Sequence, residues 1–248
     1  MTEVRKYGWR PDIKDPINDI PYLLSGKPIP PMMDLRPKMP PVYDQLALGS
    51  CTSNAIAGCI EYNFHIMNHI DFTPSRLFIY YNERAKEGTV NSDSGARISD
   101  GLYVVNKQGV CPETEWPYRI EKFATKPPKV CYKDALKDIV KRYKRLNNLT
   151  QIKDSIAQGY PVIFGFSVYE SFESDQVAKT GIIPMPKPGE QLLGGHCVLA
   201  SGYKDDVQRV ITRNSWGETW GIKGYFELPY DYFNNDLVSD CWVIYYAV

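Results

Sequence analysis

Apolar residues are spaced differently in the two halves of this chain. In the first half they recur every three to four residues, the spacing that places them on one face of a helix. Ser, Thr and Gly residues at the expected positions mark where helices begin and end. The pattern predicts a helix of about 18 residues after Ser50. It predicts shorter helices from Thr73-Pro74 to Gly88, over Ser99 to Lys107, and from Thr150 to Gly159.

After about residue 145 the pattern favours strands. Short runs rich in β-branched and aromatic residues follow one another, with turn residues between them. The predicted strands are Val162 to Val168, Cys197 to Tyr203, Val210 to Asn214, Gly224 to Leu228 and Trp242 to Tyr246. A helical first half and a largely β second half predict the α+β class, with two lobes that meet at a cleft.

The first 30 residues differ from the rest. Six prolines lie at or just after this segment, and they prevent a long helix and favour an extended chain. We therefore expect residues 1–30 to form an extended strap and residues 31–248 to form the main domain. The strap could cover a cleft or pack elsewhere on the surface.

Composition and charge exclude some partners. The chain has 248 residues, of which 43% are apolar and 13% aromatic, as in soluble globular proteins. Zero net charge argues against a polyanion binder, and we interpret the basic cluster from Lys137 to Arg145 as a solvated strand or helix face. The sequence contains no apolar run long enough to span a membrane.

These observations lead us to expect a monomer without nucleic-acid or membrane partners. The amino terminus lacks the apolar stretch of a secretory signal, so we expect an intracellular protein, either cytoplasmic or packaged in a particle.

The cysteine and histidine spacings predict neither a metal site nor a cofactor. Six cysteines are scattered along the chain without a CxxC pair, so most are expected to be free thiols. Cys111 and Cys131 are the pair to test first for a disulfide. His65 and His69 are one helical turn apart, but Ile66 stands where a zinc protease needs a glutamate.

Three residues have the chemistry of nucleophilic catalysis. Cys51 is expected in the first turn of a helix, where the helix dipole lowers the pKa of a thiol. His196, which follows two glycines, can act as its base, and Asn214 can orient the imidazole ring. Isolated residues of these types are more often structural, so their combination carries the prediction.

The residues around these three resemble the papain and cathepsin family of cysteine peptidases. Gln45 lies six residues before Cys51, and His196 and Asn214 follow well over a hundred residues later. Further family-like segments are Pro31 to Arg36, Asp93 to Ala96, Gly109 to Pro112 and Trp116 to Tyr118. The resemblance implies a two-lobe fold, with a helical lobe at about 34–140 and an antiparallel, barrel-like β lobe at about 141–248.

The resemblance also implies roles for individual residues. Gln45 and the Cys51 backbone N–H would stabilise the oxyanion, and Trp216 would shield the bond between His196 and Asn214 from water. The residues implied in substrate binding are Gly95, Ala96, Gly195, Trp216 and Asp240. Asp240 would lie at the floor of the main specificity pocket and favour a basic side chain.

Three departures from the family pattern bear on these roles. Leu48 replaces a disulfide cysteine, which agrees with a reducing compartment. Thr52 replaces the tryptophan after the nucleophile and leaves the packing beneath Cys51 undetermined. Ala96 replaces a glycine of the substrate groove and could alter one backbone contact to the peptide.

The sequence therefore predicts a cysteine peptidase that forms a thioester acyl-enzyme. We expect an endopeptidase made as a zymogen, with residues 1–30 as a short inhibitory segment and a peptide or protein as substrate. The alternatives are a papain-fold thiol acyltransferase or amidase, a transglutaminase-like thiol transferase, and a non-catalytic peptide-binding protein.

Overall fold

The computed structural model describes residues 6–13, 21–68 and 72–245. Its helices are α1 (Cys51–Ile66), α2 (Arg76–Glu87), α3 (Ile98–Lys107), α4 (Lys129–Ala135), α5 (Leu149–Ala157), α6 (Asp175–Thr180) and α7 (Asp231–Asn234). Its strands are β1 (Met32–Asp34), β2 (Arg142–Leu146), β3 (Val162–Tyr169), β4 (Leu192–Lys204), β5 (Arg209–Arg213), β6 (Tyr225–Pro229) and β7 (Val238–Tyr245).

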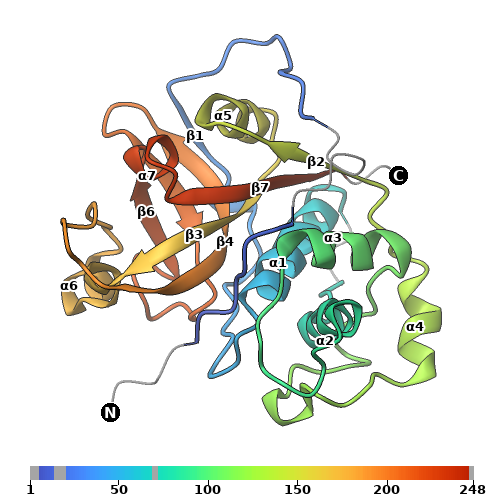
Figure 1. The fold of residues 1–248 in the computed structure, drawn as a ribbon. Coiled ribbons are helices and arrows are strands. Elements are labelled where there is room, and N and C mark those ends of the chain that lie inside the picture. The colour runs from blue at the N-terminus through green and yellow to red at the C-terminus, as the bar shows by residue number, and fades with distance from the viewer. Residues whose placement is uncertain (1–5, 14–20, 69–71, 246–248) are drawn as a thin grey trace.

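The fold has two parts, which are formed mainly by the two halves of the chain. Helices α1 to α4 lie together on one side, and an antiparallel sheet lies on the other (Figure 1). The strand order is β2-β7-β3-β4-β5-β6, and β1 adds to β4. Helix α1 packs against β4, so the first helix lies between the two parts. This arrangement agrees with the predicted α+β class.

Two helix starts differ from the prediction. Helix α2 begins after Ser75, whose hydroxyl accepts a hydrogen bond from the third helical N–H at 3.1 Å, and not at Thr73. Helix α5 begins after Asn148, whose side chain accepts the equivalent bond at 2.9 Å, and not after Thr150. In each case several capping residues are adjacent in sequence, and the one whose oxygen reaches the N–H decides the start.

The strands extend beyond the predicted runs, and some elements were not predicted. Strand β4 begins five residues before its predicted start at Cys197, and β7 begins at Val238; the predicted end at Tyr246 lies outside the described residues. Part of the basic cluster forms β2, an edge strand with exposed Arg142 that pairs with β7. The elements α4, α6, α7 and β1 are too short for the periodicity to show.

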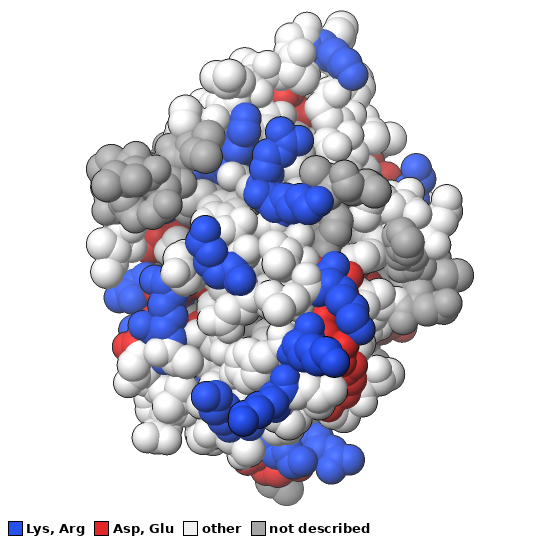
Figure 2. Space-filling model, turned by 90° about the vertical axis from the view of Figure 1, so that its right-hand side faces the viewer, with Lys and Arg blue, Asp and Glu red and all other residues white. Residues whose placement is uncertain are grey.

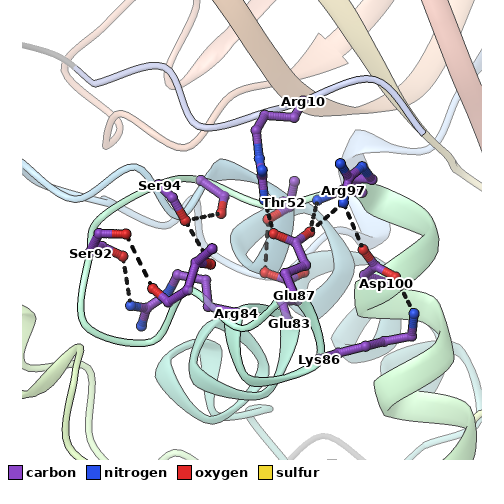
Figure 3. A network of polar contacts seen from close by, with 12 residues as sticks. Arg10, Thr52, Glu83, Arg84, Lys86, Glu87, Ser92, Ser94, Arg97 and Asp100 are labelled. Carbon is purple, nitrogen blue, oxygen red and sulfur yellow. Dashed lines mark hydrogen bonds and ion pairs between the residues drawn. The ribbon is translucent and has the colours of Figure 1, made fainter. Parts of the chain in front are cut away.

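A polar network connects the first three helices behind the start of α1 (Figure 3). Glu83 of α2 is fully buried and accepts a hydrogen bond at 2.9 Å from the Thr52 hydroxyl of α1. Gly101 of α3 lies so close that a Cβ atom there would be 2.2 Å from Oε1 of Glu83. The threonine that replaces the family's tryptophan thus binds a buried carboxyl group. Burial raises the pKa of Glu83 to about 8.

We expect Glu83→Gln to change how stability depends on pH. The folded-state pKa of about 8 exceeds the reference value of 4.5, so Glu83 binds its proton more tightly in the folded protein. Its contribution is complete below pH 4.5 and is lost as the pH rises through 8. Urea unfolding should therefore show the wild type losing up to about 1.4 kcal/mol per pH unit relative to Glu83→Gln between these values.

The exposed Glu121 provides the matched control. Glu121→Gln should leave the pH dependence of the unfolding free energy as in the wild type. Parallel curves for the wild type and Glu83→Gln would contradict a raised pKa at Glu83.

Candidate active site

Cys51 is the first residue of α1 and is fully buried. The backbone N–H groups of Cys197 and Gly8 lie close enough to its sulfur to favour the thiolate. Cys197 follows His196 in β4, so the contact between α1 and β4 brings the predicted nucleophile beside the predicted base. Ser50, predicted as the helix cap, uses its hydroxyl instead in a 2.5 Å bond with Tyr118.

His196 is held by its neighbours in the β part. Its Nε2 lies 2.8 Å from Oδ1 of Asn214, and because an amide oxygen only accepts, Nε2 is the donor. Trp216 stacks on the imidazole, with the ring centroids 5.0 Å apart and an interplanar angle of 28°. Asn214 is itself fixed, since its Oδ1 also accepts a 2.8 Å bond from the backbone N–H of Ser215. The predicted pairing of histidine and asparagine is thus present in the structure.

Gln45 is fully buried, and hydrogen bonds to both its amide oxygen and its amide nitrogen fix the orientation of the side chain. Oε1 accepts a bond of 2.6 Å from the Ser215 hydroxyl, which leaves Nε2 to donate. Nε2 donates to the carbonyl oxygens of Leu48 at 2.9 Å and Lys6 at 3.1 Å. A backbone carbonyl of the amino-terminal segment therefore lies on the amide that was predicted to bind an oxyanion.

Residues 6–13 of the strap run between the two parts and are bonded to both of them at Ala96 and Gly195; we call this contact region the groove (Figure 1). Ala96 donates its N–H to the Gly8 carbonyl at 2.8 Å and accepts from the Arg10 N–H at 3.0 Å. Gly195 accepts from the Trp9 N–H, also at 3.0 Å. Two of the positions predicted to bind substrate thus bind the strap through their backbones, and the alanine at position 96 keeps both of its backbone contacts.

The glycines of the groove make room for the strap. Gly95, another predicted binding position, has a φ of +68°, and a Cβ atom there would be 1.9 Å from the Gly8 carbonyl oxygen. The buried Trp9 indole is closely packed by Gly165 and Gly195, where a Cβ atom would come within 2.0 and 2.5 Å of its ring. The sequence prediction missed Trp9 and Gly165, because neither belongs to a recognised motif.

Side chains fix the strap at both ends of this contact. Tyr7 packs edge-on against His196, with centroids 5.9 Å apart, and its hydroxyl donates to Glu173. Arg10 forms an ion pair with Glu87 of α2, whose side chain is only 3% exposed (Figure 3). These contacts cover Cys51 and His196 from solvent.

Burial under the strap affects the chemistry of the thiol. The sequence analysis predicted a lowered pKa for Cys51, but burial raises the pKa to about 11. Desolvation outweighs the N–H groups of Cys197 and Gly8, which favour the thiolate. In the covered state described by the structure, the predicted lowering is therefore wrong.

Asp240 lies beside the strap but is already paired. Its carboxylate contacts Arg145 at 3.0 Å and accepts a 2.7 Å bond from the Asp12 backbone N–H. Together with Pro11 and Asp12, it lines a cavity of about 370 Å³. The carboxylate of Asp240 is thus engaged by Arg145, which also pairs with Asp12, and by the strap, so the structure gives no support for the predicted preference for a basic substrate side chain.

The remaining predicted features show no link to this site. All six cysteines, which lie in the described residues, are free thiols, so Cys111 and Cys131 are not bonded. His65 lies near the end of α1, and His69 falls outside the described residues. Within the ranges that the structure describes, no helix is both long enough and apolar enough to cross a membrane.

Comparisons with known proteins agree with this geometry. A profile of the papain family cysteine proteases matches residues 29–243. Xylellain, a cysteine protease from Xylella fastidiosa, is 41% identical, has a TM-score of 0.91, and each chain is covered completely. An uncharacterized peptidase C1-like protein of Acanthamoeba polyphaga mimivirus is 44% identical over 81% of this chain and 68% of its own length.

A more distant relative is pro-cathepsin H of Bos taurus, which is 27% identical over 90% of this chain and 66% of its own length. The chain thus spans about two thirds of the curated relatives that it matches. The extent of the profile match and the similarity to xylellain confirm the predicted two-lobe fold and the predicted peptidase class. The chain belongs to the papain family of cysteine proteases, which hydrolyse peptide or protein substrates.

Proposed function

We propose that Cys51, His196, Asn214 and Gln45 form the catalytic site of an endopeptidase whose groove is blocked by the strap. The observation that carries this proposal is the bond from Gln45 to the Lys6 carbonyl. An amide donor aimed at a backbone carbonyl, next to a cysteine and a histidine, is the arrangement needed for acyl transfer.

In the proposed reaction, Nδ1 of His196 takes the proton of the Cys51 thiol, and the thiolate attacks the substrate carbonyl. Gln45 Nε2 stabilises the oxyanion of the tetrahedral intermediate. The imidazolium then gives its proton to the leaving amine, and a thioester on Cys51 remains. Water, activated by His196, hydrolyses the thioester and restores the thiol. Asn214 and Trp216 keep the imidazole in the required orientation.

The course of the strap supports endopeptidase action. Lys6 and Tyr7 lie on the side of Gln45 and Trp216, whereas Trp9 to Asp12 lie on the side of Ala96 and Asp240. An extended chain thus fits on both sides of Cys51, as cleavage within a polypeptide requires. An acyltransferase or amidase would share the thioester step, so product analysis with a peptide of known sequence separates these alternatives.

We also propose that residues 1–30 are inhibitory and that residues 31–248 are the catalytic unit. The strap uses the backbone groups of Ala96 and Gly195 and covers the sulfur of Cys51, so no peptide can bind in the same place. Activation then requires that the strap be displaced or cut. A papain-type mechanism also requires a lower thiol pKa than the covered state allows, and exposure of Cys51 removes the desolvation that raises it.

Trp9→Ala should release the strap and speed labelling of Cys51 by an epoxide or vinyl-sulfone probe. Loss of a buried aromatic side chain removes about 1.5–3 kcal/mol of apolar burial, so the labelling rate should rise about tenfold to a hundredfold. Leu24→Ala is the control, because Leu24 precedes the main domain but is 53% exposed. Equal rates for Trp9→Ala, the wild type and a chain that begins at Pro31 would contradict inhibition.

In the Trp9→Ala background, Gln45→Ala should lower kcat for a fluorogenic peptide by about 100- to 1000-fold, because one oxyanion donor is lost. Cys51→Ala should abolish both labelling and turnover. Gln176→Ala, at an exposed position of α6, should leave kcat unchanged. Turnover that survives Cys51→Ala would refute the proposed nucleophile, whatever the state of the strap.

A further inference from the structure

Three potential metal ligands outside the groove meet between the segment after α3 and helix α4. The ligand atoms of Cys111, Glu115 and Cys131 all lie within 4.8 Å of one another. Both cysteines are fully buried free thiols. Four tetrahedral ligands of a zinc ion would be about 3.5–4 Å apart, given bonds of about 2.0–2.3 Å, so this cluster needs only small side-chain adjustments to bind one.

The glutamate of this cluster has one carboxylate oxygen without a hydrogen bond among the described residues. This oxygen, Oε2 of Glu115, is buried. The carboxyl of Asp134, one turn after Cys131 in α4, lies against Glu115. Two thiols and two carboxyl groups, all potential metal ligands, thus lie side by side.

We propose that Cys111, Glu115 and Cys131 bind one thiophilic divalent cation, of which Zn²⁺ is the best fit. Asp134 lies against Glu115 but is not among the three ligands within 4.8 Å of one another, so a water molecule would complete the tetrahedral shell. On binding, Zn²⁺ forms two zinc–sulfur bonds, and the two thiol protons pass to the solvent.

Geometry and charge favour this ion over other occupants of the cluster. A disulfide between Cys111 and Cys131 would use both sulfurs but leave the buried carboxylate oxygen of Glu115 without a partner. A calcium or magnesium ion prefers a shell of oxygen ligands, which two buried thiols do not provide. In sequence, Glu115 follows Cys111 by four residues and Asp134 follows Cys131 by three. These spacings match no CxxC motif, so the sequence alone predicted no metal site.

The charge of the surface above the cluster also bears on which metal ion can bind. Lysine and arginine side chains gather on the face of the molecule that bears α4, where few acidic residues are visible (Figure 2). Lys129, Lys133 and Lys137 of this region are exposed, and Lys137 pairs with Asp134. A basic surface disfavours the approach of any cation, so the bonds to the ligands must outweigh this repulsion. Bonds to thiolates are strongest with a thiophilic metal.

A metal at this position would fasten α4 to the body of the helical part. Tyr132 of α4 reaches Asn82 of α2 with a 3.1 Å hydrogen bond, and the Cys111 carbonyl accepts a 2.8 Å bond from the N–H of Ser75, the cap of α2. The ligands thus connect α4 to the loop that supports the start of α2. The metal would stabilise the fold and take no part in peptide hydrolysis.

The test uses the reduced full chain with Cys51→Ala, so that the proposed nucleophile does not bind the probe. Titration with Co²⁺ should produce thiolate-to-cobalt charge-transfer absorption in the near ultraviolet at one equivalent, and Zn²⁺ should displace it. Zinc should also raise the Tm of this protein. Cys111→Ala should abolish the absorption, whereas Cys241→Ala, which removes a buried cysteine outside the cluster, should retain it.

Glu115→Gln keeps both thiols and should still fold, as circular dichroism can verify. It should raise the Kd for Zn²⁺ by about tenfold or more and reduce the zinc-dependent increase in Tm. Absence of the cobalt absorption in the folded, reduced protein would overturn the proposal. A Kd for Zn²⁺ that Glu115→Gln leaves unchanged would also overturn it. So would a chain that forms a disulfide between Cys111 and Cys131 in air, with the loss of two hydrogens, and that binds no metal when reduced.

Discussion

The contact between the first turn of α1 and strand β4 is the constraint on which the rest of the site depends. Cys51 belongs to a helix and His196 to the middle of a sheet, so neither position can be adjusted alone. Strand β4 is paired on both sides, with β3 opposite His196 at Phe166 and with β5 farther along. A slip of one residue would turn His196 to the other face of the sheet, so the strand pairings hold the proposed base on the side of the proposed nucleophile.

The strap binds to backbone groups of Ala96 and Gly195, on the two sides of the contact between α1 and β4. Ala96 and Gly195 present N–H and carbonyl groups on the two sides of the groove, and residues 8–10 satisfy them as an added strand would. Each such bond contributes only about 0.5–1.5 kcal/mol, so the buried Trp9 and the ion pair of Arg10 with Glu87 are needed to keep the segment in place. In the proposed peptidase, covering the site and recognising a peptide therefore use the same surface.

The sequence predicted the features that depend on local spacing. The helical and β halves, most strands and the pairing of His196 with Asn214 follow from periodicity and from motifs that resemble a known family. Features that join distant residues outside a recognised motif were not predictable. The bond from Thr52 to Glu83 and the position of Glu115 beside Cys111 and Cys131 exist because the chain folds back on itself. The true helix caps were hidden among adjacent residues with equal capping ability.

The pair of Thr52 and Glu83 shows how a departure from the family pattern affects the nucleophile. A charged Glu83 raises the pKa of Cys51, since two negative charges so close together repel each other. The neutral carboxylic acid lacks this effect and still accepts the hydrogen bond from Thr52. Because burial raises its pKa to about 8, Glu83 stays largely neutral at neutral pH. Thr52 and Glu83 thus place a hydrogen-bonded neutral acid, and not a carboxylate charge, behind the Cys51 sulfur at neutral pH.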